Sequence, residues 1–305
     1  MPNVTTEQKQ SIIQLIEAKK EQLGTYEAVA NFCNVSPTAI NLMKANKYNT
    51  KGDEAWFEVG LKLGLFNTWL TYENTDCKSI AKVLHDARVN STFLRIVDSG
   101  GIGKSTGLKY YAQNDKGGNV YYIRCLEWGK KEFMSKLCQT LGISISKGYK
   151  NPNEMVEIVI EHLQQKSQLK PQILIDEANK LKRSAKLYLI PLFNECEDFL
   201  SVVIAGPEDL DKEIETGVKN GWKGYDEIDS RFGRRSIKLI GSTIQEVIGI
   251  CKLNGFDDEE KIKDAFEKSK PVRKNITIKS QPVVLRVVTD LRRIKQMVKL
   301  NRKSA

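Results

Sequence analysis

Residues 92–106 read TFLRIVDSGGIGKST, and this stretch decides the fold. A short apolar run at 93–97 is followed by a glycine-rich turn and then by residues that favour a helix. This order predicts a strand, a phosphate-binding loop and a helix. Backbone N–H groups of such a turn, at a helix N-terminus, bind anions. Lys104 would reach the terminal phosphates of a nucleotide, and the Ser105 hydroxyl would bind Mg²⁺.

The loop departs from the pattern G-x-x-x-x-G-K-[ST] at its first position, where Asp98 replaces glycine. Aspartate tolerates unusual backbone dihedral angles, so the turn can still form. A carboxylate beside a triphosphate is unfavourable, however, so we expect slow or partner-dependent hydrolysis. Taken alone, the stretch also allows a chance Gly/Lys/Ser loop. The residues expected to contact the nucleotide phosphates are Gly100, Gly101, Ile102, Gly103, Lys104, Ser105 and Thr106.

A second motif supports the first. The apolar residues 173–175 predict a buried strand, and Asp176 and Glu177 follow it directly. An apolar run before an Asp-Glu pair is common, and by itself it can be an ordinary strand end. Together with Lys104 it is a Walker B candidate, in which Asp176 positions Mg²⁺ and Glu177 acts on the attacking water.

Strands and helices alternate through the middle of the chain. Further strands are expected at 120–124, 200–205 and 236–240, with helices at 128–141 and 151–165. This alternation predicts the α/β class, as a three-layer sandwich around a parallel sheet. Ligands of such sheets bind at the carboxyl ends of the strands.

Three arginines, Arg231, Arg234 and Arg235, precede the last of these strands in the sequence SRFGRRS. Each can be an ordinary solvated surface charge. In an assembly of P-loop ATPases, one of them could instead reach the γ-phosphate bound by a neighbouring subunit.

The N-terminal residues 1–66 predict a small helical domain. Two short helices joined by a tight turn at Asn34 resemble the helix-turn-helix of phage-repressor-type proteins, and the second helix would present a polar face to DNA. A purely structural or protein-docking role is the alternative. The residues of that face are Thr38, Asn41, Lys44 and Lys47.

The remaining domains follow from changes in composition. Residues 67–75 are expected to be a polar linker, 76–240 the α/β core, and 241–305 a basic, all-helical lid with helices at 244–253, 257–266 and 283–300. Between Lys268 and Lys303, twelve basic residues accompany one acidic residue, Asp290. A run of this kind is either a solvated helix face or a contact for DNA phosphates or an acidic partner.

The composition indicates the surroundings of the protein. Lysine and arginine total 48 against 38 acidic residues, a net charge of +10 over 305 residues, which favours a polyanionic partner such as nucleic acid. Six scattered cysteines without a C-x-x-C pair indicate buried, reduced thiols. The sequence has no signal core and no membrane-spanning run. We therefore expect a soluble, cytoplasmic protein that binds no membrane.

In the order of its motifs the chain resembles the AAA+ ATPases that regulate DNA transposition, the family of the phage Mu B protein, with the TnsC and IstB regulators as wider relatives. The resemblance covers most of the chain. It implies ATP and Mg²⁺ as cofactors, with Lys104 and Glu177 as catalytic residues and Ser105 and Asp176 as Mg²⁺ ligands. It also implies that Arg231 is the arginine finger, with Arg234 and Arg235 as alternates. Arg286, on a lid helix, would be the sensor-2 arginine that contacts the nucleotide.

The resemblance also implies partners. Proteins of this family bind double-stranded DNA with little sequence preference when loaded with ATP, form helical filaments on it, and deliver it to a transposase that stimulates hydrolysis. Basic residues that follow the second strand and the Walker B motif would face the DNA; each alone is an ordinary solvated charge. They are Lys130, Lys131, Lys180, Lys182 and Arg183.

Two other functions fit the sequence. A helicase loader would use the same ATPase chemistry but would bind a replicative helicase and prefer single strands. A helix-turn-helix transcriptional regulator would bind a specific operator as a dimer, with a degenerate nucleotide site for which Asp98 is the argument. The intact Lys104, Ser105, Asp176 and Glu177 argue against that regulator.

Overall fold

The structure is a computed structural model that describes residues 4–48, 53–65, 69–144, 151–278 and 281–302. Residues 67 and 68 of the expected linker, and Lys279 and Lys303 of the basic run, lie outside this part. The chain divides into two compact units. Unit 1 comprises Met1–Thr68, Asp115–Ile173 and Lys180–Leu200, and unit 2 comprises Trp69–Asn114, Leu174–Asn179 and Ser201–Ala305.

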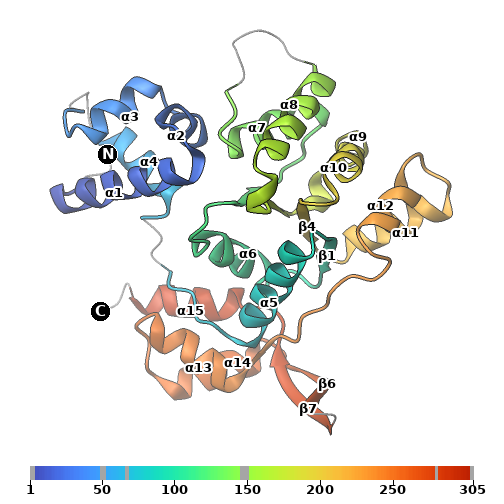
Figure 1. Cartoon of the computed structure of the whole chain (residues 1–305). Coiled ribbons are helices and arrows are strands. Elements are labelled where there is room, and N and C mark those ends of the chain that lie inside the picture. Colours follow the sequence, from blue (N-terminus) through green and yellow to red (C-terminus); the bar gives the residue numbers. More distant parts are fainter. Residues whose placement is uncertain (1–3, 49–52, 66–68, 145–150, 279–280, 303–305) are drawn as a thin grey trace. The chain divides into compact units, whose positions relative to one another are not determined.

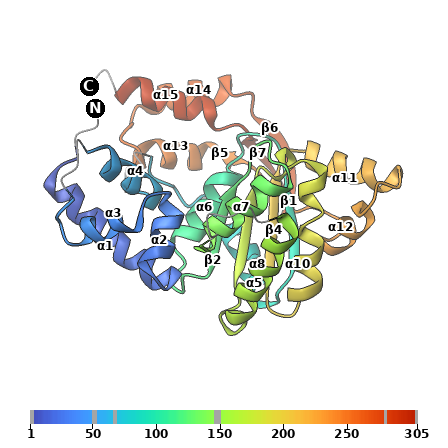
Figure 2. The same ribbon diagram turned by 90° about the horizontal axis from the view of Figure 1, so that it is seen from above.

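The central sheet has four strands in the order β1-β4-β3-β2. Strands β1 and β4 lie side by side in Figures 1 and 2. The strands are β1 (Phe93–Val97), β2 (Val120–Arg124), β3 (Gln172–Asp176) and β4 (Ser201–Gly206). β1 and β4 run parallel, with Phe93 opposite Val202. The predicted α/β class with a parallel sheet is therefore confirmed.

The strand expected at 236–240 is wrong in extent. Only Ile237 pairs, in an isolated parallel bridge with Ile96. Its N–H donates to the Arg95 carbonyl at 2.8 Å, and its carbonyl accepts from Val97 N–H at 3.1 Å. The segment leaves the sheet because its next amides, beginning at Leu239, donate to side-chain carboxylates instead of to a strand.

Four helices of unit 1 form the N-terminal bundle: α1 (Thr6–Leu23), α2 (Tyr26–Cys33), α3 (Pro37–Lys44) and α4 (Glu54–Leu63). Thr5 and Gln8 make a capping box at the start of α1. Ser36 caps α3, and Asn34 has the left-handed conformation, with a φ of 62°, between α2 and α3. The predicted pair of short helices with a tight turn is therefore present.

The N-terminal bundle packs on other elements of unit 1. α2 contacts α7, and the Gln139 amide of α7 donates to the Asn31 carbonyl of α2 at 2.8 Å. α7 in turn packs against α8 and α9. The remaining helices of unit 1 are α7 (Lys130–Thr140), α8 (Pro152–Gln165), η1 (Ser167–Leu169), α9 (Arg183–Lys186) and α10 (Leu189–Cys196). The short helix η2 (Ala178–Lys180) spans the division between unit 2 and unit 1.

Unit 2 carries the helices that flank the phosphate-binding loop. α5 (Thr75–Val89) packs against α6 (Lys104–Gln113), and α11 (Asp209–Lys219) packs against α12 (Tyr225–Arg231). The close packing of α5 and α6 depends on Gly107, since a Cβ there would lie 2.7 Å from Ile80 Cδ1. α6 is therefore fixed directly behind the loop.

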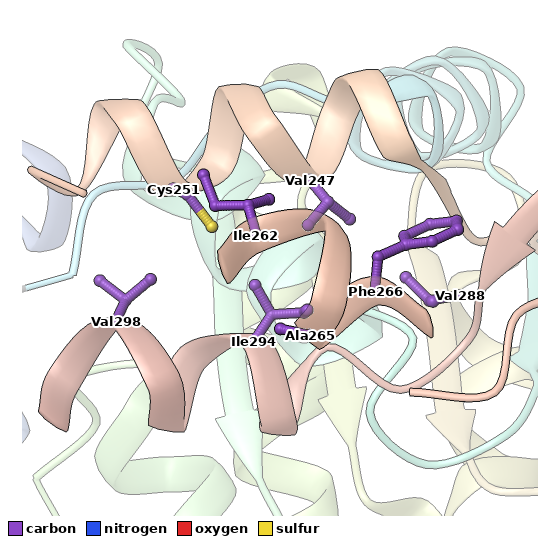
Figure 3. Packing of buried hydrophobic residues seen from close by; sticks show 8 residues of the cluster. All are labelled: Val247, Cys251, Ile262, Ala265, Phe266, Val288, Ile294 and Val298. Carbon is purple, nitrogen blue, oxygen red and sulfur yellow. The ribbon is translucent and has the colours of Figure 1, made fainter. Parts of the chain in front are cut away.

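Residues 242–302, which we call the C-terminal module, contain both helices and strands. The elements are β5 (Ser242–Thr243), α13 (Ile244–Leu253), α14 (Glu259–Lys268), β6 (Val272–Ile278), β7 (Gln281–Val288) and α15 (Arg292–Arg302), with the antiparallel sheet in the order β5-β7-β6. The three helices enclose an apolar core (Figure 3). Its buried residues are Val247, Cys251, Ile262, Ala265, Phe266, Val288, Ile294 and Val298.

The expectation of an all-helical lid is therefore wrong. Residues 283–288, expected at the start of a long helix, lie in β7, and the helix begins only at Arg292. The β-branched valines of this run favour a strand. β6 supplies the partner, with Arg273 opposite Arg286.

Two predictions from composition can be compared with the structure. All six cysteines are buried and form no disulfide, as predicted. Among the helices of the described ranges, none is both long and apolar enough to cross a membrane.

The core of the C-terminal module gives a test of the fold. Ile262 is completely buried in this core, so Ile262→Ala should destabilise the module by about 2–5 kcal/mol through lost burial and a residual cavity. Hydrogen exchange of the amides in residues 244–302 measures this loss. Leu253→Ala is the control, because Leu253 is 43% exposed on the same module. Equal exchange in the two variants would contradict the packing described.

Candidate nucleotide-binding site

The phosphate-binding loop lies between β1 and α6, as predicted. Gly101 and Gly103 have φ angles of 92° and 117°, a region that residues with a Cβ rarely adopt. α6 begins at Lys104, so its first backbone N–H groups lie at the end of the loop and have no partner within the helix. These groups, with the helix dipole, form an anion site.

Lys104 is the central charge of the site. Its side chain is buried, and Nζ donates to the carbonyl oxygens of Asp98 at 2.6 Å and Ser99 at 2.8 Å. Burial lowers the pKa of Lys104, and the nearby carboxylates of Asp98, Asp176 and Glu177 oppose that shift. The lysine and the acidic pair that the sequence predicted are therefore brought together.

The acidic pair stands at the carboxyl end of β3. Asp176 is 2% exposed, and its Oδ1 accepts from the Glu177 N–H at 3.0 Å. Glu177 has a φ of 57°, a left-handed conformation that costs a residue with a Cβ about 1–2 kcal/mol. Such strain is concentrated at functional sites. A buried carboxylate beside a strained one fits the division of roles between Mg²⁺ binding and water activation.

The oxygen ligands that Mg²⁺ prefers are present in unit 2. The Ser105 hydroxyl lies in the first turn of α6, and the Asp176 carboxylate lies at the end of β3. Asp176 is close enough to Lys104 to oppose the lowering of the lysine pKa, and Ser105 directly follows Lys104 in the chain. This donor set fits Mg²⁺ with a bound nucleoside triphosphate.

The turn between β7 and α15 also lies against the loop, which sequence reasoning missed. The Leu291 N–H donates to the Gly101 carbonyl at 3.1 Å. A Cβ at Gly101 would lie 2.1 Å from Asp290 Oδ1, and one at Gly100 would lie 3.2 Å from Arg292 Nη2. Arg292 also contributes to lowering the pKa of Lys104. The C-terminal module thus places the Asp290 carboxylate against Gly101 and the Arg292 guanidinium against Gly100.

The placement of Arg286 on a lid helix is wrong. Arg286 lies on β7, and its guanidinium forms two hydrogen bonds with the Glu267 carboxylate, one of them at 2.7 Å. The arginine of this module that lies against the phosphate loop is Arg292. No local motif marks Arg292, because its position depends on the path of the chain after β7.

A polar side chain that follows the acidic pair lies against the end of β4. Asn179 Oδ1 lies 3.2 Å from the position of a Cβ on Gly206, at the end of β4. That oxygen is buried, and it has no hydrogen-bond partner within the described ranges. Asn179 is therefore a polar group at the strand ends, two residues after Glu177, that the sequence reading did not identify.

The candidate finger arginines lie at and after the end of α12. Arg231 forms a salt bridge with Glu227 of the same helix at 2.6 Å. Arg234 and Arg235 are exposed. α12 is tied to the sheet by Arg95 of β1, whose buried guanidinium donates to Asp229 at 2.8 Å.

The basic residues expected to face DNA lie in two segments of unit 1. Lys130 and Lys131 open α7, and the other three, Lys180, Lys182 and Arg183, precede or open α9. The Lys182 N–H donates to the Trp128 carbonyl at 2.9 Å, which brings the two segments side by side. All of these side chains are exposed except that of Lys180, which is half-buried.

Comparison with known proteins agrees with this geometry. Residues 90–214 match the family model described as AAA domain. This segment is similar to AAA domains, and it covers less than half of the chain. It runs from the residues before β1 into α11 and contains the loop, Asp176 and Glu177, so nucleotide binding, typically of Mg-ATP, is implied for it.

Solved structures show more distant likeness. Cdc6p from Pyrobaculum aerophilum aligns with a TM-score of 0.48 and 15% identity over 70% of this chain and 57% of that one. The ORC2 protein of Aeropyrum pernix, in ADPNP-ADP complexes, aligns with a TM-score of 0.43 and 13% identity over 61% and 52%. Drosophila ORC bound to AT-rich DNA and Cdc6 aligns with a TM-score of 0.35 and 11% identity over 83% and 100%. The chain thus spans little more than half of the first two proteins. No curated protein matches it.

Lys104→Ala should abolish nucleotide binding, because it removes the buried ammonium at the loop. Titration with a fluorescent ATP analogue measures the affinity, and we expect a loss of about 100-fold or more for a charged contact of this kind. Lys109→Ala is the matched control, since Lys109 is an exposed lysine on the same helix. Equal affinities would contradict the site.

Gly101→Ala should displace the turn between β7 and α15, because its Cβ would overlap Asp290. Hydrogen exchange at the Leu291 amide should then accelerate. Gly103→Ala is the control for backbone strain, since Gly103 also has a positive φ but a Cβ there meets nothing within 4 Å. Acceleration in both variants alike would show that strain, and not contact with Asp290, is responsible.

Proposed function

We propose that the chain is a Mg²⁺-dependent ATPase that binds double-stranded DNA in its ATP-loaded state and delivers it to a transposase. The observation that carries the ATPase part is the buried Lys104 at the start of α6, with Asp176 and Glu177 close enough to oppose the shift of its pKa. A buried ammonium group is unfavourable unless hydrogen-bond acceptors or anionic neighbours offset its desolvation.

Each residue of the site would have one task. Lys104 and the N–H groups at the start of α6 hold the phosphates, and Ser105 with Asp176 holds Mg²⁺, which neutralises charge on the phosphates when bound. Glu177 orients the attacking water and accepts its proton. Asn179 Oδ1 accepts a second hydrogen bond from that water.

Arginines would complete the site. Arg292 takes the nucleotide-contacting role first expected of Arg286, because it lies against Gly100. Arg231, Arg234 and Arg235 are candidates for the finger that reaches a neighbouring subunit. Arg231 can do so only if its salt bridge with Glu227 opens, whereas Arg234 and Arg235 are exposed.

DNA binding is supported by charge on both units. In unit 1, the hydrogen bond from the Lys182 N–H to the Trp128 carbonyl holds the two basic segments close together. In unit 2, the exposed face of the β6–β7 hairpin carries Arg273, which lies opposite Arg286, whose guanidinium is paired with Glu267. Contacts of this kind bind phosphates, so binding should depend steeply on salt and little on sequence.

The filament and the transposase rest on the resemblance of the motifs and their order. The two other functions predict different partners: a helicase loader would prefer single strands, and a regulator would bind one operator as a dimer without needing ATP.

Electron microscopy with random-sequence duplex DNA tests the proposal. The wild-type chain should coat DNA only with ATP, and Glu177→Gln should form coats that persist, because hydrolysis falls by about 10²–10⁴-fold when a catalytic base is lost. Steady-state ATPase assays of the two proteins give the matching rates, and Glu208→Gln serves as the control for an exposed glutamate. Discrete dimers that form with or without ATP would favour the regulator, and coating of single strands alone would favour the helicase loader.

A further inference from the structure

Asp98 does not present its carboxylate to the phosphate site. Oδ1 accepts from the Ser99 N–H at 2.7 Å and from the Ser99 hydroxyl at 3.3 Å, and Oδ2 accepts from the Leu239 N–H at 2.8 Å. The side chain is 7% exposed. Both oxygens are therefore committed to hydrogen bonds with the protein, and one of those bonds joins residues 141 positions apart.

The partner of Asp98 lies where the chain passes from the sheet into the C-terminal module. Ile237 is the last residue bridged to β1, and β5 begins at Ser242. Between them, the Leu239 carbonyl accepts from Lys274 Nζ of β6 at 2.8 Å. Side chains therefore hold both the N–H and the carbonyl of Leu239.

Asp76 holds the next two amides of this passage. Its Oδ1 accepts from Ile240 N–H and its Oδ2 from Gly241 N–H, both at 2.8 Å. Beside it, Asn74 Nδ2 donates to the Ser242 hydroxyl at 2.8 Å, and Asp76 is 2% exposed. Residues 239–241 are thus held by carboxylates from two places, α5 and the phosphate loop.

Asp98 also contacts the lysine of the site. Its backbone carbonyl accepts from Lys104 Nζ at 2.6 Å. A continuous series of hydrogen bonds therefore runs from Lys104 through Asp98 to Leu239 and on to Lys274 of β6. A movement of Lys104 toward a phosphate acts on the first bond of this series.

We propose that Asp98 is a positioning residue that couples the phosphate loop to the C-terminal module. This role of Asp98 rests on the proposed function, because the event that Asp98 would transmit to the module is nucleotide binding at Lys104. With glycine at position 98 the loop would keep its shape and its lysine, but the Leu239 amide would lose its acceptor. Coupling between sites requires such a physical connection whose arrangement both sites influence.

Hydrogen exchange on the full chain, with and without a non-hydrolysable ATP analogue, tests this role. In the wild type, the analogue should change exchange in residues 239–243 and 272–278, which the series of hydrogen bonds reaches. In Asp98→Gly, the Leu239 amide should exchange about 10-fold faster or more without nucleotide, since a charge-assisted hydrogen bond is lost. The response of residues 272–278 to the analogue should disappear, whereas residues 290–292, which lie directly against the loop, should still respond.

Asp98→Asn provides a second variant of nearly the same size, with one acceptor oxygen where the wild type uses two. Its change in hydrogen exchange on adding the analogue should lie between those of the wild type and Asp98→Gly. This variant keeps the test valid if Asp98→Gly does not fold. Asp209→Asn is the control, because Asp209 is an exposed carboxylate at the start of α11, and it should behave as the wild type.

The outcomes separate this inference from the proposed function. A wild-type response of residues 272–278 in a folded Asp98→Gly that binds the analogue would overturn the coupling role and leave the ATPase proposal intact. Failure of the wild type to bind the analogue would overturn both.

Discussion

A buried ammonium group constrains the whole site. Lys104 is 7% exposed, and a charge in such a place would cost several kcal/mol if it had no partners. The carbonyls of Asp98 and Ser99 accept its protons, and the carboxylates at the end of β3 offset the desolvation. Those carboxylates reach the site because β1 and β3 belong to one parallel sheet, with β4 between them, so that their carboxyl ends lie at the same edge. The arrangement of the strands therefore supplies the negative charge that the buried lysine needs.

Much of the core could be predicted from the sequence, because its signals are local. The apolar runs of β1 and β2 have the predicted bounds, and Asn34 makes the predicted turn between α2 and α3. The prediction failed at 283–288, where the apolar run of β7 fits either a helix or a strand when read alone. Its pairing with β6 decided the outcome, and that pairing is not visible in the pattern of β7 itself.

The site likewise contains residues that local motifs mark and residues that only the tertiary structure brings to it. Lys104, Ser105, Asp176 and Glu177 belong to two short motifs whose residue types state their chemistry. Asp290 and Arg292 reach the loop only because the chain turns after β7 and places the Leu291 N–H on the Gly101 carbonyl. Their position depends on how the C-terminal module folds, so neither composition nor spacing marks them.

The residue that breaks the phosphate-loop pattern is also the one that completes the hydrogen bonding of the passage into the C-terminal module. This structural task gives the departure from glycine at position 98 a reason other than the loss of nucleotide binding. Here both carboxylate oxygens accept from backbone amides, and leaving a buried amide such as that of Leu239 unsatisfied costs about 1–3 kcal/mol. The intact contacts of Lys104 with the same residue show that this bond and the phosphate-binding arrangement coexist. Asp98 is therefore a poor argument for a degenerate site, and the regulator hypothesis loses the feature that supported it.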